Sequence, residues 1–129
     1  MLDNAPLTYV SNSSLHGRGL FAEIPFLKGE VVLNYALFPE VWYECLYSEL
    51  SEDKRQNSGH VMIDHERCIT TSVETKFRYV NHSRNPSCDW DFKNRLLIAN
   101  RLILHGEEIT IDYRQEPSPF DNGYFPEWM

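Results

Sequence analysis

The sequence lacks the features of several large protein classes. It has no apolar run near the roughly 20 residues that a membrane-spanning helix needs. Residues 1–9 have neither the basic start nor the apolar stretch of a secretory signal. A net charge of −7 argues against direct binding of nucleic acid, because phosphate contacts need a basic surface. We therefore expect an intracellular, cytoplasmic protein, nuclear in a eukaryote, with no membrane or direct nucleic-acid partner.

Cysteine is also scarce, and its spacing excludes a disulfide framework. The sequence has three cysteines, Cys45, Cys68 and Cys88, which are far apart and odd in number. We interpret them as reduced thiols. The histidines near Cys68 match no usual zinc-ligand spacing, so we predict no metal site.

What the sequence does contain is typical of one ordinary globular domain. Its 129 residues suit a single domain, residues 1–129, with a modest core. Short β-branched or apolar clusters alternate with turn signals, which predicts a mostly β (α+β) fold. The expected strands lie around residues 20–22, 31–33, 61–63, 96–98 and 109–111.

Two helices and an unusual tail complete the expected organisation. Apolar groups at helical spacing over residues 41–50 predict a short amphipathic helix. A second helix is expected over residues 72–79, where Ser72 offers a cap. Residues 117–129 are proline-containing but rich in aromatics, so we expect them to fold back onto the domain.

Three segments carry polar groups suited to a ligand. In Gly17-Arg18-Gly19 neither glycine has a Cβ, so backbone amides could approach a ligand closely, although an ordinary turn remains the alternative. Asn81 and His82 offer donors and acceptors, but could equally tie a loop together. Tyr113 closes an expected strand, with its hydroxyl at the inner edge or as the wet tip of a core residue.

Taken together, these segments resemble the SET domain of protein lysine methyltransferases, in the family's order, over residues 7–113. The first is Gly17-Arg18-Gly19-Leu20-Phe21-Ala22 with Lys28-Gly29-Glu30 downstream. The second is Arg78-Tyr79-Val80-Asn81-His82-Ser83 with Pro86, similar to Arg-Phe-x-Asn-His-Ser-Cys-x-Pro-Asn. The third is Ala99-Asn100-Arg101 through Gly106-Glu107-Glu108-Ile109-Thr110-Ile111-Asp112-Tyr113, similar to Gly-Glu-Glu-Leu-Thr-x-Asp-Tyr.

The resemblance implies a β-clip-like fold of several small sheets, with a knot-like crossing of the Asn-His segment and the C-terminal strand. It implies a methyltransferase that uses S-adenosylmethionine to methylate the ε-amine of lysine in a basic protein or peptide, with a histone as one candidate. Catalysis would fall to Tyr113, which would orient the amine and stabilise charge. The implied cofactor-binding residues are Gly17, Arg18, Gly19, Asn81 and His82.

The resemblance also suggests how the site would be closed. Residues 1–113 would form the SET core and residues 114–129 an aromatic closing segment, because no cysteine-rich zinc segment follows Tyr113. We expect the tail to cover the cofactor through Phe120 and Trp128. The substrate channel would be walled by Trp90, Ile111 and Phe125.

Two positions depart from the family pattern. Ser87 replaces the usual Asn after the proline, which predicts a looser loop. Arg84 replaces the usual Cys, and we expect it to lie on an exposed loop without touching the site. Among the acidic residues, Asp112 is expected to pair with a cation or amide, and Glu107 and Glu108 to mark a solvated turn.

Two other interpretations stay open. The chain could keep the fold without the activity, as a binding module for a basic partner, or serve only as an assembly surface. A homodimer also stays an option, because pairing would enlarge the surface of so small a domain for peptide capture.

Overall fold

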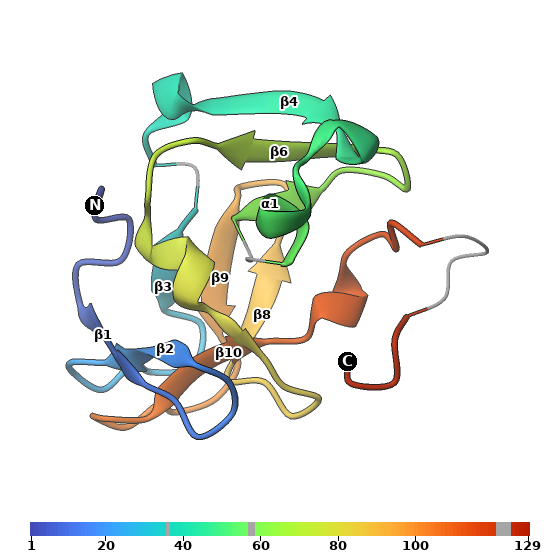
Figure 1. Cartoon of the computed structure of the whole chain (residues 1–129). Coiled ribbons are helices and arrows are strands. Elements are labelled where there is room, and N and C mark those ends of the chain that lie inside the picture. Colours follow the sequence, from blue (N-terminus) through green and yellow to red (C-terminus); the bar gives the residue numbers. More distant parts are fainter. Residues whose placement is uncertain (36, 57–58, 121–124) are drawn as a thin grey trace.

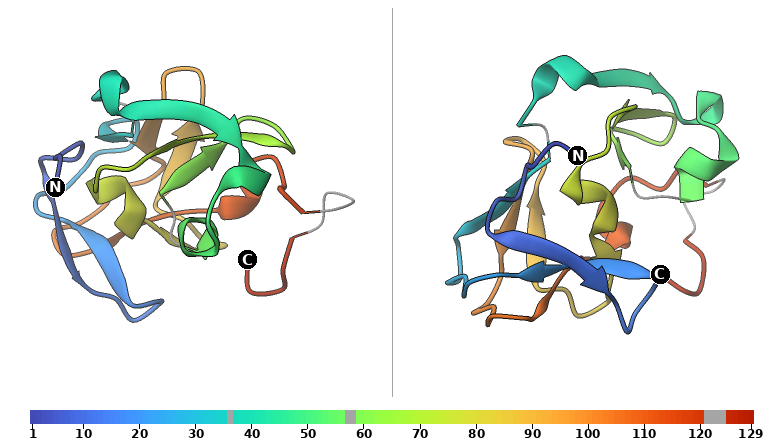
Figure 2. Two further views of the ribbon diagram at one scale, coloured as in Figure 1. Left: turned by 45° about the horizontal axis from the view of Figure 1, so that its top comes forward. Right: turned by 60° about the vertical axis from the view of Figure 1, so that its left-hand side comes forward.

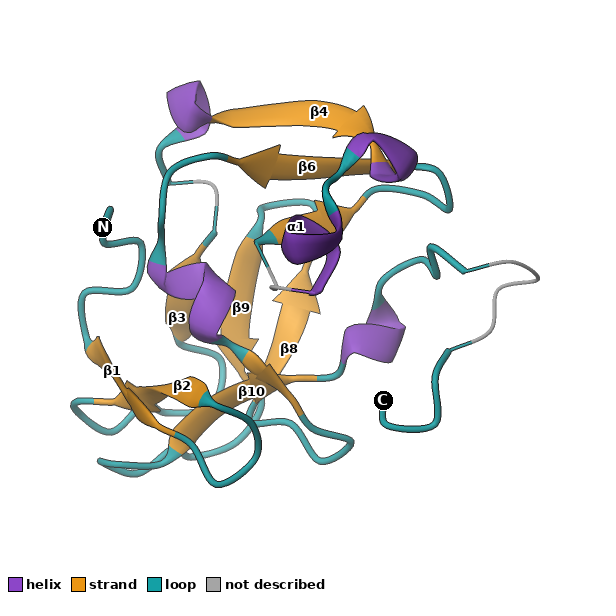
Figure 3. Cartoon of the chain, in the orientation of Figure 1, coloured by secondary structure: helices purple, strands orange, loops and turns teal. Residues whose placement is uncertain are grey.

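The computed structural model describes every residue except 36, 57–58 and 121–124. The described part is mostly β: ten strands form three small sheets, accompanied by one short α-helix and four 3-10 helices (Figure 3). This confirms the predicted fold class. None of the described helices is long and apolar enough to cross a membrane.

The first sheet holds both ends of the candidate site. Its four strands, in spatial order, are β1 (Thr8–Asn12), β2 (Arg18–Ala22), β10 (Glu108–Ile111) and β7 (Asn81–His82). Strand β10 pairs antiparallel with β2 and parallel with β7, so the Asn-His segment crosses against the last strand as expected. Figure 1 shows this sheet at the bottom of the molecule.

The other two sheets stack above it. The middle sheet has the order β3 (Val31–Asn34), β9 (Leu96–Ala99) and β8 (Cys88–Asp91). The upper sheet has the order β4 (Trp42–Leu46), β6 (Arg67–Thr71) and β5 (His60–Met62). The views of Figure 2 show β4 at the end of the molecule opposite to β1 and β2.

Strand β10 lies between two other strands and is buried in the hydrophobic core. Its pattern is buried on both faces from Ile109 onward, as expected for a strand flanked by two others. Ile109, Ile111 and Leu20 of β2 are at most 1% exposed. Burying each such side chain contributes about 1.5–3 kcal/mol to stability. The core therefore holds β10 firmly in place beside the candidate site residues.

The helix predicted over residues 41–50 is wrong. This segment is a 3-10 turn, η1 (Pro39–Val41), then strand β4, then a second 3-10 turn, η2 (Tyr47–Glu49). All five residues of β4 pair with β6, and that pairing outweighs a helical spacing of apolar groups. The short α-helix, α1 (Glu52–Gln56), follows immediately.

The helix expected over residues 72–79 is only half present. A 3-10 helix, η3 (Lys76–Tyr79), occupies its second half and leads directly into β7. A last 3-10 turn, η4 (Tyr113–Gln115), follows β10, so the strand ends at Ile111 and Tyr113 belongs to this turn.

Candidate functional site

The glycine turn is built for close approach of the chain. Gly17 has φ +46°, a left-handed conformation that favours glycine. A Cβ on Gly19 would lie 2.6 Å from Oε2 of Glu108 and 3.1 Å from Cβ of Ser13. Glycine is therefore favoured at both positions, at Gly17 by backbone conformation and at Gly19 by space.

Asn81 joins this turn to the last strand. Its side-chain nitrogen donates to the carbonyl oxygens of His16 and Arg18, at 3.0 and 3.1 Å, and to Oε2 of Glu108 at 2.9 Å. In the described part of the chain no group donates to its Oδ1. Asn81 thus holds the glycine turn against β10. Its side-chain oxygen stays available as an acceptor for a ligand.

Glu108 was expected in a solvated turn, and that is wrong. It begins β10, and its carboxylate accepts hydrogen bonds from the Ser13 hydroxyl at 2.6 Å and from Asn81. Glu107, by contrast, lies on the turn and pairs with Arg101 at 2.9 Å. Sequence alone missed Glu108 because its partners, Ser13 and Asn81, lie 95 and 27 positions away along the chain.

His82 is fixed by the backbone of the residue predicted to be catalytic. Its Nδ1 accepts a hydrogen bond from the Tyr113 amide at 3.0 Å, so the ring proton resides on Nε2. Burial lowers the pKa of His82, opposed by Asp112 and by the nearby Met129 backbone. Nε2 is itself buried and has no partner in hydrogen-bonding geometry among the described residues.

Tyr113 packs against His82 with ring centroids 5.1 Å apart. Its hydroxyl donates to the carbonyl oxygen of Val80 at 2.7 Å. The phenol is therefore held over the Asn-His segment rather than pointing away from the molecule. The structure brings Tyr113, His82 and, through β7, Asn81 with the glycine turn into one region.

Asp112 pairs with a cation, as expected. Arg114 donates from its guanidinium to Oδ2 at 2.7 Å, and from its backbone amide to Oδ1 at 2.9 Å. The Arg114 guanidinium beside Asp112 holds the pKa of that carboxyl below its usual value. This pairing caps η4 and so orients the turn that carries Tyr113.

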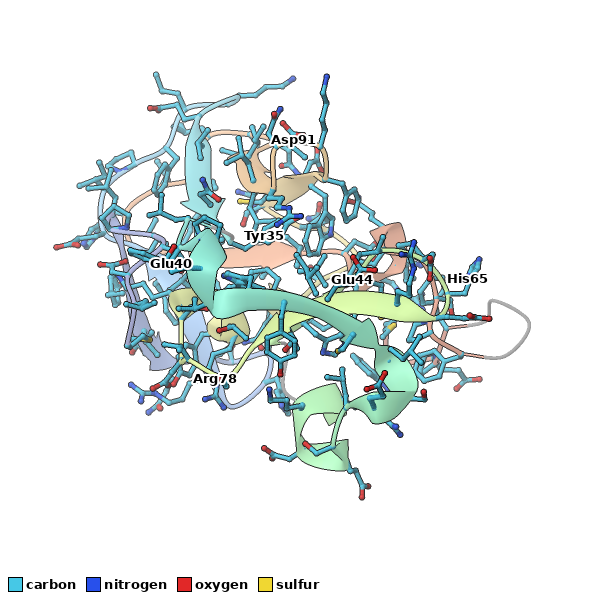
Figure 4. The ribbon with its side chains drawn as sticks, turned by 90° about the horizontal axis from the view of Figure 1, so that it is seen from above. Tyr35, Glu40, Glu44, His65, Arg78 and Asp91 are labelled. Atoms are coloured by element: carbon cyan, nitrogen blue, oxygen red, sulfur yellow. The ribbon has the colours of Figure 1, made fainter. Side chains whose placement is uncertain are left out.

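One of the proposed channel residues, Trp90, lies in an aromatic cluster that sequence reasoning did not foresee. Trp90 packs against Tyr35 and Phe77, with ring centroids 5.6 and 6.0 Å apart, and its indole nitrogen approaches the Asp112 carbonyl at 3.4 Å. Tyr35 is 1% exposed and lies in the interior beneath β4 (Figure 4). Burial raises the pKa of Tyr35 to about 12. The sequence signal for the burial of Tyr35 is its position directly after the apolar strand at residues 31–34.

Ile111 is a core residue at 1% exposure, adjacent in sequence to the Asp112 that contacts Trp90. Two pockets, of about 160 and 230 Å³, lie away from Tyr113 and Trp90. The first is lined by Lys54, Glu74 and Arg78 among others, and the second by residues near β3. Neither is lined by Tyr113, and among the described residues no three acidic, histidine or cysteine side chains form a metal-binding group.

The tail folds back as expected, and one of its aromatics reaches the site. Trp128 packs edge-on against His82 and Tyr113, with ring centroids 6.1 and 6.3 Å apart. Phe120 and Phe125 are half-buried along the same segment. Figure 1 shows the C-terminus returning toward η4.

Two further contacts hold the start of the tail. The His65 ring nitrogen Nδ1 lies 2.8 Å from the Ser118 carbonyl, at the rim of the molecule (Figure 4). A carboxylate oxygen of Glu116 accepts from the Met62 amide at 2.8 Å. The tail is thus fastened to the β5–β6 end of the upper sheet before it turns back.

Ser87 tightens its loop rather than loosening it. It is fully buried, its hydroxyl donates to the Glu108 carbonyl, and it accepts from the Thr110 amide, both at 3.0 Å. Arg84 lies at an exposed loop position, as expected. Its guanidinium reaches the backbone of residues 127 and 129, on either side of Trp128.

The chain is similar in sequence to known proteins over most of its length. The sequence pattern of one family, described as "SET domain", matches residues 17–114. Over 120 residues the chain is 30% identical to "Histone-lysine N-methyltransferase trr" of Drosophila melanogaster, covering 82% of the chain and 5% of that protein. It is 29% identical over 116 residues to "Histone-lysine N-methyltransferase 2B" of Homo sapiens, covering 81% of the chain and 4% of the relative.

A shorter relative is also similar. The chain is 28% identical over 110 residues to "N-lysine methyltransferase KMT5A-A" of Danio rerio, covering 75% of the chain and 32% of that protein. The chain therefore spans only a small part of the curated relatives that it matches.

Proposed function

Because the chain belongs to the SET-domain family, we propose that it is an S-adenosylmethionine-dependent methyltransferase that acts on the ε-amine of lysine in a protein. The observation that carries the proposal is the meeting of three separate segments. Asn81 binds the glycine turn, His82 binds the Tyr113 backbone, and both residues lie on β7 beside β10. The similarity to named lysine methyltransferases supports the same reaction.

Two polar side-chain groups of the Asn-His segment suit the cofactor. Oδ1 of Asn81 is an acceptor that fits an ammonium group, and the buried N–H at Nε2 of His82 is a donor that fits a purine nitrogen. Gly17 and Arg18 expose backbone at the same turn. Asn81, His82 and the residues 17–19 would therefore hold S-adenosylmethionine, with Trp128 and Phe120 of the tail beside it.

When bound, S-adenosylmethionine supplies an electrophilic methyl group on a positively charged sulfur. The Tyr113 hydroxyl donates its hydrogen to the Val80 carbonyl oxygen, which fixes the orientation of the phenol in the candidate site. We assign Tyr113 the role of orienting the lysine amine and stabilising positive charge, since a phenol with a reference pKa of about 10 is a poor base at neutral pH.

The aromatic surroundings would help the amine to react. A lysine side chain lying against Trp90 would lose water, and burial lowers the pKa of an ammonium group. A neutral amine held in line with the methyl group changes a two-body encounter into a one-body step, which is a large kinetic gain. Ile111 and Phe125 are proposed as further walls of that channel.

The substrate is proposed to be a lysine in a basic protein segment. The chain carries 19 acidic and 12 basic residues, which favours a basic partner. Relatives named as histone methyltransferases make a histone the first candidate.

The test is transfer of a labelled methyl group to a mixture of basic proteins. The wild-type protein should label a protein lysine, and Tyr113→Phe should abolish the label while retaining cofactor affinity by calorimetry. Tyr9→Phe, on the exposed side of β1, is the control and should keep activity. Cofactor binding without transfer by the wild type would instead identify an inactive binding module.

A further inference from the structure

The last described residues form a turn that presents Trp128. The Met129 amide donates to the Pro126 carbonyl at 3.1 Å, which places Trp128 as the third residue of the turn. Trp128 is 66% exposed, so most of its indole faces away from the protein even though one edge meets His82 and Tyr113. So little burial gives weak hydrophobic anchoring, and another contact has to fix the turn.

Arg84 supplies that contact. Its Nε donates to the Met129 carbonyl at 2.5 Å and its Nη2 donates to the Glu127 carbonyl at 3.2 Å. The two acceptors lie immediately before and after Trp128. A planar guanidinium with fixed donors can hold two carbonyls at once, which a flexible ammonium does less well.

The loop that carries Arg84 is anchored on both sides of this residue. The Ser83 amide donates to the Ile111 carbonyl at 2.9 Å, and Ser87 is buried against Thr110. Arg84 stands between these two anchors and two residues after His82. It therefore connects the element that bears His82 directly to the turn that bears Trp128.

We infer that Arg84 is a positioning residue, which holds the indole of Trp128 against His82 and Tyr113 so that its exposed face covers the bound nucleoside cofactor. The ligand part of this inference rests on the proposed function, whereas the placement of Trp128 by Arg84 does not. A flat, exposed indole is suited to stacking on a purine. The positive charge of Arg84 also contributes to the lowered pKa of His82.

The first measurement needs no cofactor. The three tryptophans give three indole N–H signals in a nitrogen–proton NMR spectrum, and Trp128→Phe assigns one of them. Arg84→Ala should shift that signal alone and should expose residues 125–129 to limited proteolysis. Arg84→Lys keeps the charge but not the planar pair of guanidinium donors, and it should give an intermediate shift. Arg101→Ala removes another exposed arginine, paired with Glu107, and should leave the signal unchanged.

The second measurement uses the demethylated cofactor product in calorimetry. Arg84→Ala and Trp128→Ala should each raise its Kd about tenfold, a difference of roughly 1.4 kcal/mol. The double variant should raise the Kd no further, because both changes remove the same covering group. At saturating cofactor Arg84→Ala should keep the turnover of the wild type, so that the loss appears in KM rather than kcat.

The outcomes separate the two proposals. An unshifted Trp128 signal in Arg84→Ala would overturn the positioning role. A shifted signal with an unchanged Kd would overturn the covering of the cofactor. A wild-type protein that binds no cofactor but still shows the Arg84-dependent shift would overturn the proposed function and leave the positioning of Trp128 in place.

Discussion

The side-chain nitrogen of Asn81 lies 2.9 Å from Oε2 of Glu108, and this contact joins residues that are 27 positions apart. The same nitrogen reaches the carbonyls of His16 and Arg18. Three acceptors around one amide leave no choice of orientation, because only a donor satisfies them. The orientation of Oδ1 of Asn81 is therefore fixed by the protein before any ligand binds.

Asn81→Asp should be strongly destabilising although it changes no volume. A carboxylate would face another carboxylate and two carbonyl oxygens, which leaves them without a donor and adds repulsion. We expect a loss of about 3 kcal/mol in the free energy of unfolding, measured by urea titration. Asn85→Asp, on the exposed loop nearby, should change stability by less than about 0.5 kcal/mol. Equal stability of the two variants would refute the orienting role of Glu108.

Gly19→Ala should lower stability through a clash with Glu108 and Ser13. The added Cβ would lie 2.6 Å from Oε2 of Glu108, so one of the two must move. Overpacking of this kind costs about 1–3 kcal/mol.

A double-mutant cycle checks the cause of the loss. In a Glu108→Ala background the cost of Gly19→Ala should fall clearly, because the nearest obstacle is gone. A cost that is the same in both backgrounds would mean that the carboxylate is not the obstacle.

Ser87→Ala should destabilise the protein by about 1–3 kcal/mol, because it leaves the buried Thr110 amide without an acceptor. Thermal and urea unfolding measure this cost. Ser14→Ala, at an exposed position, is the matched control. If both variants unfold alike, the serine does not fasten the loop to β10.

Glu116 should make stability depend on pH between about 4.5 and 8. Burial raises the pKa of Glu116 from 4.5 to about 8, with the Met62 amide opposing the shift. In this range the folded protein holds a proton that the unfolded chain has lost. Stability therefore falls as pH rises, by at most about 1.4 kcal/mol per pH unit.

Glu116→Gln should remove this part of the pH dependence, because the amide does not titrate. The measurement is the free energy of unfolding at pH 5, 6, 7 and 8 for both proteins. Glu127→Gln, at an exposed position, should leave the slope as it is in the wild type. Identical slopes in wild type and Glu116→Gln would show that the carboxyl is solvated.

The parts of the site that sequence could predict are those with local signals. The glycine turn, Asn81-His82 and the approach to Tyr113 could be read because each occupies a short segment with unusual residue types. The mostly β class followed from short apolar clusters between turn residues. The structure brings those segments together through β10.

The parts that could not be predicted depend on partners far along the chain. Glu108 and Arg84 resemble ordinary surface residues until Asn81 and the turn at 126–129 are placed beside them. The false helix at 41–50 has the same origin, since only the distant β6 makes that segment a strand. Tyr35 differs from other buried aromatics only by its neighbours Trp42, Phe77 and Trp90.

The position of β10 between β2 and β7 also governs when the site can exist. A chain emerging from the ribosome has made its glycine turn and its Asn-His pair long before residues 108–111 leave the exit tunnel. Among the described strands, only β10 pairs with both β2 and β7. The candidate site can therefore assemble only after residues 108–111 have been made, as a step dominated by contacts between remote segments and slow for that reason.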